Sequence, residues 1–215
     1  MYVIDGIADI YHSQRNNSLF PYSVCGTTVT ANVLHYLSKR DKLFYVHDDD
    51  EVFKVLNSDT LIKKAEAYIT GGEVWMKKYL KHRGSTDYTH LNNLMIMLGE
   101  VGKYLTNYTY AFTIKYRSFK SIFESLYVDK MPLIVSGQFT KSGHYVLLIG
   151  EDLEDNGSLI FHDPYGDWNT NYKEHMGKMV KYTIEDLIES AFIKHRIKWI
   201  NDKPYILTLK PTKVK

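Results

Sequence analysis

Two apolar runs separated by a short polar turn constrain the fold of this chain more than any other feature. The run HYVLLIG begins at His144, the polar stretch EDLEDNG follows it, and the run SLIFHDP is stopped by Pro164. Short apolar runs bounded by turn residues are typical of buried strands, and a connection this short joins antiparallel neighbours. We therefore predict a β-hairpin here, and with it an antiparallel sheet.

The register of this hairpin decides which polar side chains share a face. If residue 151 lies opposite residue 158, paired residue numbers add up to 309, and Asp163 is the diagonal neighbour of His144. Any odd total keeps these two on one face and turns His162 to the other, whereas an even total, created by a bulge, separates them. On the odd register Asp163 orients the imidazole of His144; the alternative is a strand-end residue that caps a turn.

The chain has a single cysteine, Cys25, which excludes an intramolecular disulfide and a multi-thiolate zinc site. It lies in FPYSVCGTTVTANVLHYL, where turn residues give way to helical apolar spacing from Val29 to Leu37. The start of a helix favours a thiolate, because unpaired N–H groups and the helix dipole stabilise negative charge. The alternative is an inert buried thiol beside a capping residue such as Ser23 or Thr27.

A thiolate nucleophile needs an imidazole partner, and the chain has nine histidines. Of these, His144 and His162 border the predicted hairpin. Others are expected at the surface or at its boundary: His35, His47, His82, His90 and His195. Their spacing matches no metal-binding pattern such as His-Glu-x-x-His, so no metal site is predicted.

Length and charge limit the class of protein. With 215 residues and 44% hydrophobic content, the chain is expected to form one soluble domain over residues 1–215. A formal net charge of +2 is too small to indicate a nucleic-acid partner, and Lys210, Lys213 and Lys215 are expected to form a solvated basic tail. Without a signal peptide or a membrane-spanning run, we expect synthesis in the cytoplasm, with any release by a route the chain does not encode.

Three blocks of the sequence resemble a known family, the papain-fold cysteine peptidases related to the bacteriocin double-glycine-leader peptidases. The blocks are YHSQRNN…CGTTVTANVLHYL, PLIVSGQFTKSGHYVLLIGED and FHDPYGDWNTNY. The resemblance is to the stand-alone C39-like enzymes of bacteria and phages, and it implies an α+β fold in which an N-terminal helix carries the nucleophile and packs on an antiparallel sheet. Position by position, it implies that Gln14 is the oxyanion-hole glutamine, Cys25 the nucleophile, His144 the base and Asp163 the orienting acid.

The middle of the chain matches that family less clearly. Segments between about residues 50 and 128 carry apolar positions at helical spacing. They predict a helical insertion larger than a minimal leader peptidase needs, made of DTLIKKAEAYI, EVWMKKYLKHR, HLNNLMIMLGEVGKYL and SFKSIFESLY.

Aromatic residues follow Asp163 immediately, in DPYGDWNTNYKEHMGK. Tyr165, Trp168 and Tyr172 are therefore expected near the catalytic cleft, most of them as packing. Trp168 is flanked by polar residues, so we predict that it is exposed to substrate. Gly143, Tyr165 and Trp168 are the predicted substrate-binding residues.

These assignments imply cysteine-dependent amide hydrolysis that needs no metal or organic cofactor. The resemblance to stand-alone phage and bacterial members implies cleavage of peptidoglycan peptides, as by a phage endolysin or a virion-associated lytic protein. The alternatives are an intracellular peptidase that processes a protein precursor and a non-catalytic structural or binding protein of the same fold.

Overall fold

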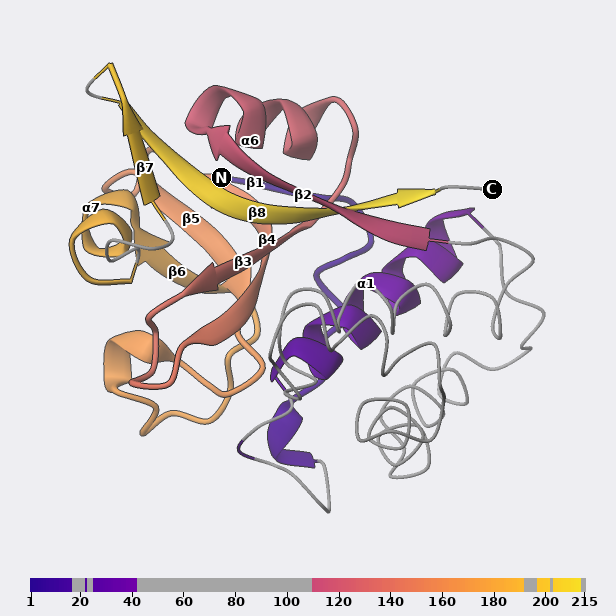
Figure 1. The fold of residues 1–215 in the computed structure, drawn as a ribbon. Coiled ribbons are helices and arrows are strands. Elements are labelled where there is room, and N and C mark those ends of the chain that lie inside the picture. The colour runs from indigo at the N-terminus through magenta and orange to yellow at the C-terminus, as the bar shows by residue number, and fades with distance from the viewer. Residues whose placement is uncertain (17–21, 23–24, 42–109, 192–196, 202, 214–215) are drawn as a thin grey trace, which may run out of the picture.

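An antiparallel sheet is the centre of the fold in the computed structural model, which describes residues 1–16, 22, 25–41, 110–191, 197–201 and 203–213 (Figure 1). The strand order along the sheet is β2-β8-β3-β4-β5-β6, with β1 paired to β4 and β7 paired to β8. The strands are β1 (Tyr2–Val3), β2 (Tyr110–Ser118), β3 (Leu133–Gly137), β4 (His144–Asp152), β5 (Ser158–His162), β6 (Val180–Thr183), β7 (Ile197–Ile200) and β8 (Lys203–Lys213).

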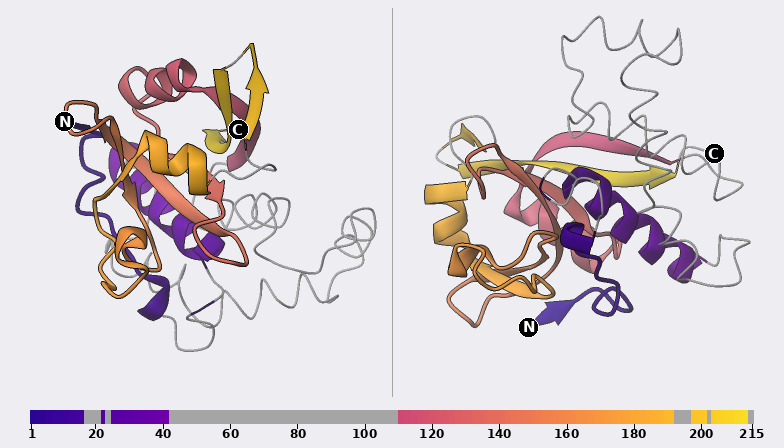
Figure 2. Two further views of the ribbon diagram at one scale, coloured as in Figure 1. Left: turned by 90° about the vertical axis from the view of Figure 1, so that its left-hand side faces the viewer. Right: turned by 90° about the horizontal axis from the view of Figure 1, so that it is seen from below.

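Two longer helices flank this sheet. The helix α1 (Cys25–Asp41) contacts β4, and α6 (Phe119–Tyr127) contacts β2 and β8. Figures 1 and 2 show α1 and α6 on opposite sides of the β2–β8 pair. The shorter elements are the 3₁₀ turns η1 (Gln14–Asn16) and η2 (Trp168–Thr170), the helical turn α7 (Ile184–Asp186) and the π-helical turn η3 (Leu187–Ala191). Across the described ranges, the helices are too short or too polar to cross a membrane.

The predicted hairpin is present as β4 and β5, and every residue of both strands is buried. Its register changes along its length. Near the turn Glu151 lies opposite Leu159, so paired numbers add up to 310, one more than we predicted there. A β-bulge between Leu148 and Gly150 shifts the pairing, and from Leu148 opposite Phe161 onward the total is 309. The odd register therefore holds at the end of the hairpin that carries His144.

The structure describes the predicted helical region between residues 50 and 128 only from residue 110 onward. That part contains one strand, β2, and one helix, α6. SFKSIFESLY contains α6 as predicted, capped by Ser118, whose hydroxyl accepts the Ser121 N–H at 3.3 Å. Residues 110–118, however, form strand β2, because their backbone pairs with β8 from residue 205 to residue 213. The other three predicted helical segments lie outside the described residues.

The basic C-terminal residues are not a solvated tail. Lys210 and Lys213 belong to β8, and Lys210 pairs with Asp129. This strand lies between β2 and β3 because its apolar side chains, including Ile206 and Leu209, are buried in the core. Lys215 lies outside the described residues.

Candidate active site

Cys25 is the first residue of α1, as the sequence predicts. Its thiol is free, and only 9% of the residue is exposed. The first backbone N–H groups of a helix have no partner within the helix, so they favour a negative charge placed beside them. Cys25 therefore lies at the end of α1 where such N–H groups are found.

His144 is the first residue of β4 and follows a tight turn. Gly143 has a φ of 84°, a left-handed conformation that glycine adopts without strain. The Gly143 N–H donates to the carbonyl of Thr140 at 3.0 Å, and the Thr140 hydroxyl donates to the carbonyl of Gly143 at 2.8 Å. This turn fixes the start of β4 and, with it, the position of the buried imidazole.

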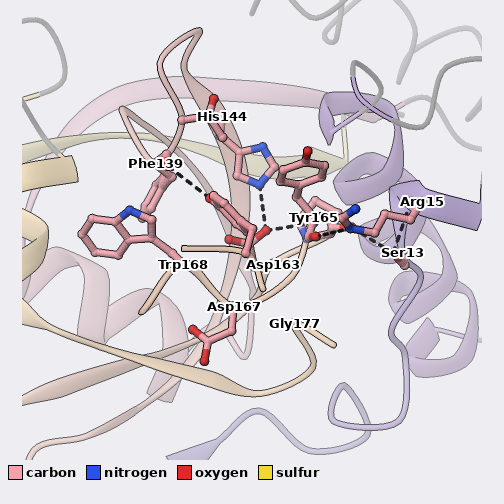
Figure 3. Close-up of polar contacts among 12 residues, drawn as sticks. Ser13, Arg15, Phe139, His144, Asp163, Tyr165, Asp167, Trp168 and Gly177 are labelled. Carbon is pink, nitrogen blue, oxygen red and sulfur yellow. Dashed lines mark hydrogen bonds and ion pairs between the residues drawn. The ribbon is translucent and has the colours of Figure 1, made fainter. Parts of the chain in front are cut away.

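His144 and Asp163 are in direct contact. Nε2 of His144 lies 2.7 Å from Oδ1 of Asp163, and both side chains are buried (Figure 3). The contact joins the first residue of β4 to the residue that follows β5, on the same face, which is what the odd register predicts. Since Nε2 is used in this bond, Nδ1 is the nitrogen that His144 can offer to a nucleophile.

Further donors hold Asp163 in place. The carboxylate is completely buried, so its charge is costly unless its oxygens accept hydrogen bonds. Oδ1 also accepts the backbone N–H of Tyr165 at 2.9 Å, and Oδ2 accepts the hydroxyl of Tyr182 at 3.0 Å. These bonds give both carboxylate oxygens a donor and direct Oδ1 toward His144.

The charges around His144 favour its protonated form. Burial by itself lowers the pKa of His144, but the Asp163 carboxylate and Cys25, which lies within hydrogen-bonding range, outweigh burial and raise that pKa to about 10. An imidazolium beside a cysteine at a helix start is the pairing from which a thiolate nucleophile forms.

His162 points to the other side of the hairpin, as predicted. Its Nε2 donates to the carbonyl of Ile7 at 3.1 Å, and its Nδ1 accepts the N–H of Met179 at 3.1 Å. Burial lowers the pKa of His162 to about 4, although the bond to Ile7 acts in the opposite direction. His162 is therefore a neutral core residue that fastens the N-terminal segment to the sheet.

Gln14 lies in a loop that is fastened to the segment after β5. The N–H of Gln14 and the hydroxyl of Ser13 both donate to the carbonyl of Pro164, at 2.9 and 3.1 Å. The hydroxyl of Tyr11 donates to the carbonyl of Asp163 at 2.9 Å. Only 2% of Gln14 is exposed, so it is not the surface residue that a glutamine in a polar turn would ordinarily be. Its role in an oxyanion hole remains a prediction.

Two tyrosines from the segment after Asp163 flank His144. The ring centroids of Tyr165 and Tyr172 each lie 6.1 Å from the imidazole, and the two tyrosine rings are 4.8 Å apart. The sequence analysis predicts both near the catalytic cleft, and in the structure both rings lie beside His144. Substrate contact by Tyr165, and by Gly143 on the other side of His144, remains a prediction.

Trp168 is less exposed than predicted. It is partly buried, and its ring packs edge-on against Phe139 and Tyr182, each with centroids 5.4 Å away. The polar neighbours of Trp168 in the sequence form the turn η2 and leave its indole to pack on the core. A contact between Trp168 and substrate stays a prediction.

His35 is expected at the surface or at its boundary, but it is buried. It is 6% exposed, and its Nδ1 lies 2.9 Å from Nε2 of His12, while the N–H of His12 donates to Asn32 at 3.0 Å. These contacts join the loop that carries Gln14 to α1. His47, His82, His90 and His195 lie outside the described residues.

Tyr182 is the residue of this site that sequence reasoning missed. Pairing between β5 and β6 places Tyr182 opposite Leu159, so Tyr182 shares a face with Phe161 and Asp163. A register argument for β6 like the one made for β4 and β5 predicts this position. It requires a third strand to be recognised, and VKYT is too short to be recognised by itself.

Comparison with known proteins gives one family match. The Peptidase_C39 like family matches residues 8–187, which include Cys25, His144 and Asp163. No curated protein and no solved structure matches the chain. Since the match spans most of the chain, the protein belongs to the Peptidase_C39 like family and has a C39-like, papain-fold peptidase domain.

Proposed function

We propose that the protein is a cysteine peptidase in which Cys25 is the nucleophile, His144 the general base and acid, and Asp163 the orienting acid. The observation that supports this most directly is the buried 2.7 Å bond between His144 Nε2 and Asp163 Oδ1. Because Nε2 is bonded to Asp163, Nδ1 of His144 is the nitrogen available to Cys25, which lies within hydrogen-bonding range of the imidazole. A nucleophile, a base and a group that orients the base are the parts that covalent acyl transfer requires.

The proposed reaction starts from a Cys25 thiolate and a His144 imidazolium. The sulfur attacks an amide carbonyl, and the side-chain amide of Gln14 and the N–H of Cys25 donate to the developing oxyanion. His144 gives its proton to the leaving amine, and water then hydrolyses the thioester with His144 as base. None of these steps needs a metal or an organic cofactor.

The pH dependence of thiol alkylation tests the nucleophile and its base. We expect iodoacetamide to modify Cys25 readily at about pH 6, where an isolated thiol is almost entirely protonated. The change His144→Ala removes the imidazolium, so the alkylation profile should move to higher pH. A wild-type protein that reacts only in alkaline solution would show that Cys25 is an inert buried thiol.

We further propose that the substrate is a peptide of peptidoglycan, on the basis of the resemblance to stand-alone bacterial and phage members of the family. Incubation with purified peptidoglycan should release new amino groups, and Cys25→Ala should abolish the release.

Gln14→Ala should lower kcat by roughly 10²–10³ with little change in KM. It should leave alkylation of Cys25 intact, because alkylation builds up no oxyanion. Turnover by Gln14→Ala at the wild-type rate would exclude that role for Gln14.

A further inference from the structure

Arg15 is held in a fixed position at the edge of the proposed active site. Its Nε donates to the carbonyl of Tyr165 at 2.7 Å, a contact between residues 150 positions apart in the chain. Its guanidinium carbon lies 4.1 Å from the centre of the Tyr165 ring. A guanidinium stacked on an aromatic ring and bonded through Nε keeps a single orientation and loses little further entropy when it binds a ligand.

Tyr165 connects this guanidinium to the catalytic pair. Its ring lies 6.1 Å from the His144 imidazole, and its N–H donates to Asp163. Figure 3 shows Tyr165 between His144 and Arg15. The ring of Tyr22, which is 73% exposed, lies 6.3 Å from that of Tyr165 on the approach from solvent. The charge of Arg15 is therefore one aromatic ring away from the base.

No carboxylate among the described residues neutralises Arg15. Within the described residues, every acidic side chain that forms an ion pair does so with another cation. These cations are the N-terminal amine, Lys130, His144, Lys178, Lys181 and Lys210. The bond from Nε uses one of the five N–H groups of a guanidinium, and the four on Nη1 and Nη2 suit a bidentate bond to a carboxylate. Arg15 is only partly buried, so a ligand beside Tyr165 can reach it.

We propose that Arg15, stacked on Tyr165, binds a carboxylate of the substrate close to the scissile amide. The inference rests on the proposed function, because it takes the surroundings of Cys25 and His144 as the place where substrate binds. It assigns the substrate class as peptides with a free carboxylate near the cleaved bond, a group that peptidoglycan stem peptides carry.

Two alkylating reagents that differ mainly in charge test this without a known substrate. Iodoacetate carries a carboxylate and iodoacetamide is neutral, and both lose iodide as the thiolate of Cys25 forms a bond to carbon. We expect the ratio of the iodoacetate rate to the iodoacetamide rate to fall roughly tenfold in Arg15→Gln, because the charged partner of the carboxylate is gone. Arg15→Lys keeps the charge and should restore part of the ratio. Lys120→Gln, which removes an exposed charge on α6, should keep the wild-type ratio.

The outcomes separate this inference from the proposed function. An unchanged ratio in Arg15→Gln, or an equal fall in both rates, would show that Arg15 only fastens the segment around Tyr165, and would overturn the inference while leaving the peptidase proposal intact. Failure of both reagents to modify the wild-type protein would overturn the proposed function and the inference together.

Discussion

At the scale of single residues, the orientation of the Asp163 carboxylate depends on the hydroxyl of Tyr182, a residue outside the proposed catalytic set. Tyr182 donates to Oδ2 of Asp163 at 3.0 Å and accepts the N–H of Trp168 at 3.1 Å. Oδ1 contacts His144, so Tyr182 binds the other carboxylate oxygen, Oδ2, which does not contact the imidazole. Burial of Tyr182, together with the nearby charge of Asp163, raises the pKa of its hydroxyl, which keeps it protonated and able to donate.

The change Tyr182→Phe removes this hydroxyl and little else. We expect the free energy of unfolding to fall by about 1–3 kcal/mol, because a buried carboxylate oxygen loses a donor. We also expect kcat to fall roughly tenfold, because the base is less firmly oriented. Urea denaturation and peptidase assays measure the two effects.

The matched control for that change is Tyr2→Phe. The hydroxyl of Tyr2 donates to the carbonyl of Leu126 in α6 at 3.0 Å, and not to a residue of the proposed catalytic set. This variant should lose stability but keep its kcat. Equal kcat values for the Tyr182 and Tyr2 variants would mean that Tyr182 contributes to stability alone.

At the scale of elements, the bulge in β4 determines whether His144 and Asp163 meet. Near the turn the paired numbers of β4 and β5 add up to 310, and continuing that register would place His162 on the face of His144 instead of Asp163. The bulge at Ile149 corrects this by one residue. Gly150 follows the bulge, and a Cβ there would lie 2.2 Å from the carbonyl oxygen of Tyr2 in β1. The bulge and the close approach of β1 therefore adjoin at Gly150.

We predict that Gly150→Ala lowers the free energy of unfolding by roughly 2–4 kcal/mol, although alanine is ordinarily no worse than glycine in a strand. The reason is the clash with the backbone of β1, which has to detach. Deleting residues 1–3 should remove most of the cost of the alanine, and a double-mutant cycle measured by urea denaturation gives the coupling. Additive effects of the two changes would show that β1 is not the cause.

At the scale of the whole molecule, the sheet depends on a strand beyond the part that matches the family. The match ends at residue 187, whereas β8 covers Lys203–Lys213 and separates β2 from β3. Ile134 and Val135 of β3 pair with Leu209 and Thr208 of β8, and all four residues are buried. A chain without β8 would expose this edge of the core to water.

We therefore propose that the chain folds as one unit, and we predict that a protein ending at residue 196 does not fold. The intact chain should unfold in one transition with the same midpoint by circular dichroism and by tryptophan fluorescence. The shortened chain should show no cooperative transition and no rapid alkylation of Cys25 at about pH 6. A shortened protein that keeps both properties would place β7 and β8 outside the folding unit.

Local sequence patterns by themselves predicted the parts of the site that lie on regular elements. The shared face of His144 and Asp163 also needs the bulge in β4, which restores the odd register. The start of α1 at Cys25, the hairpin of β4 and β5, and helix α6, by contrast, follow from spacing and turn residues. These features could be predicted because helix and strand periodicity is a property of neighbouring residues.

Tertiary structure alone decided the features that depend on contacts distant in sequence. Approach of β1 accompanies the bulge beside Gly150, and pairing with β2 and β3 turns the basic C-terminal residues into β8. Burial of Gln14 and the fixed guanidinium of Arg15 both require the loop near residue 14 to meet the segment after Asp163. No local sequence pattern predicts these contacts. The free energy that stabilises them comes from packing and hydrogen bonds between segments that only the complete fold brings together.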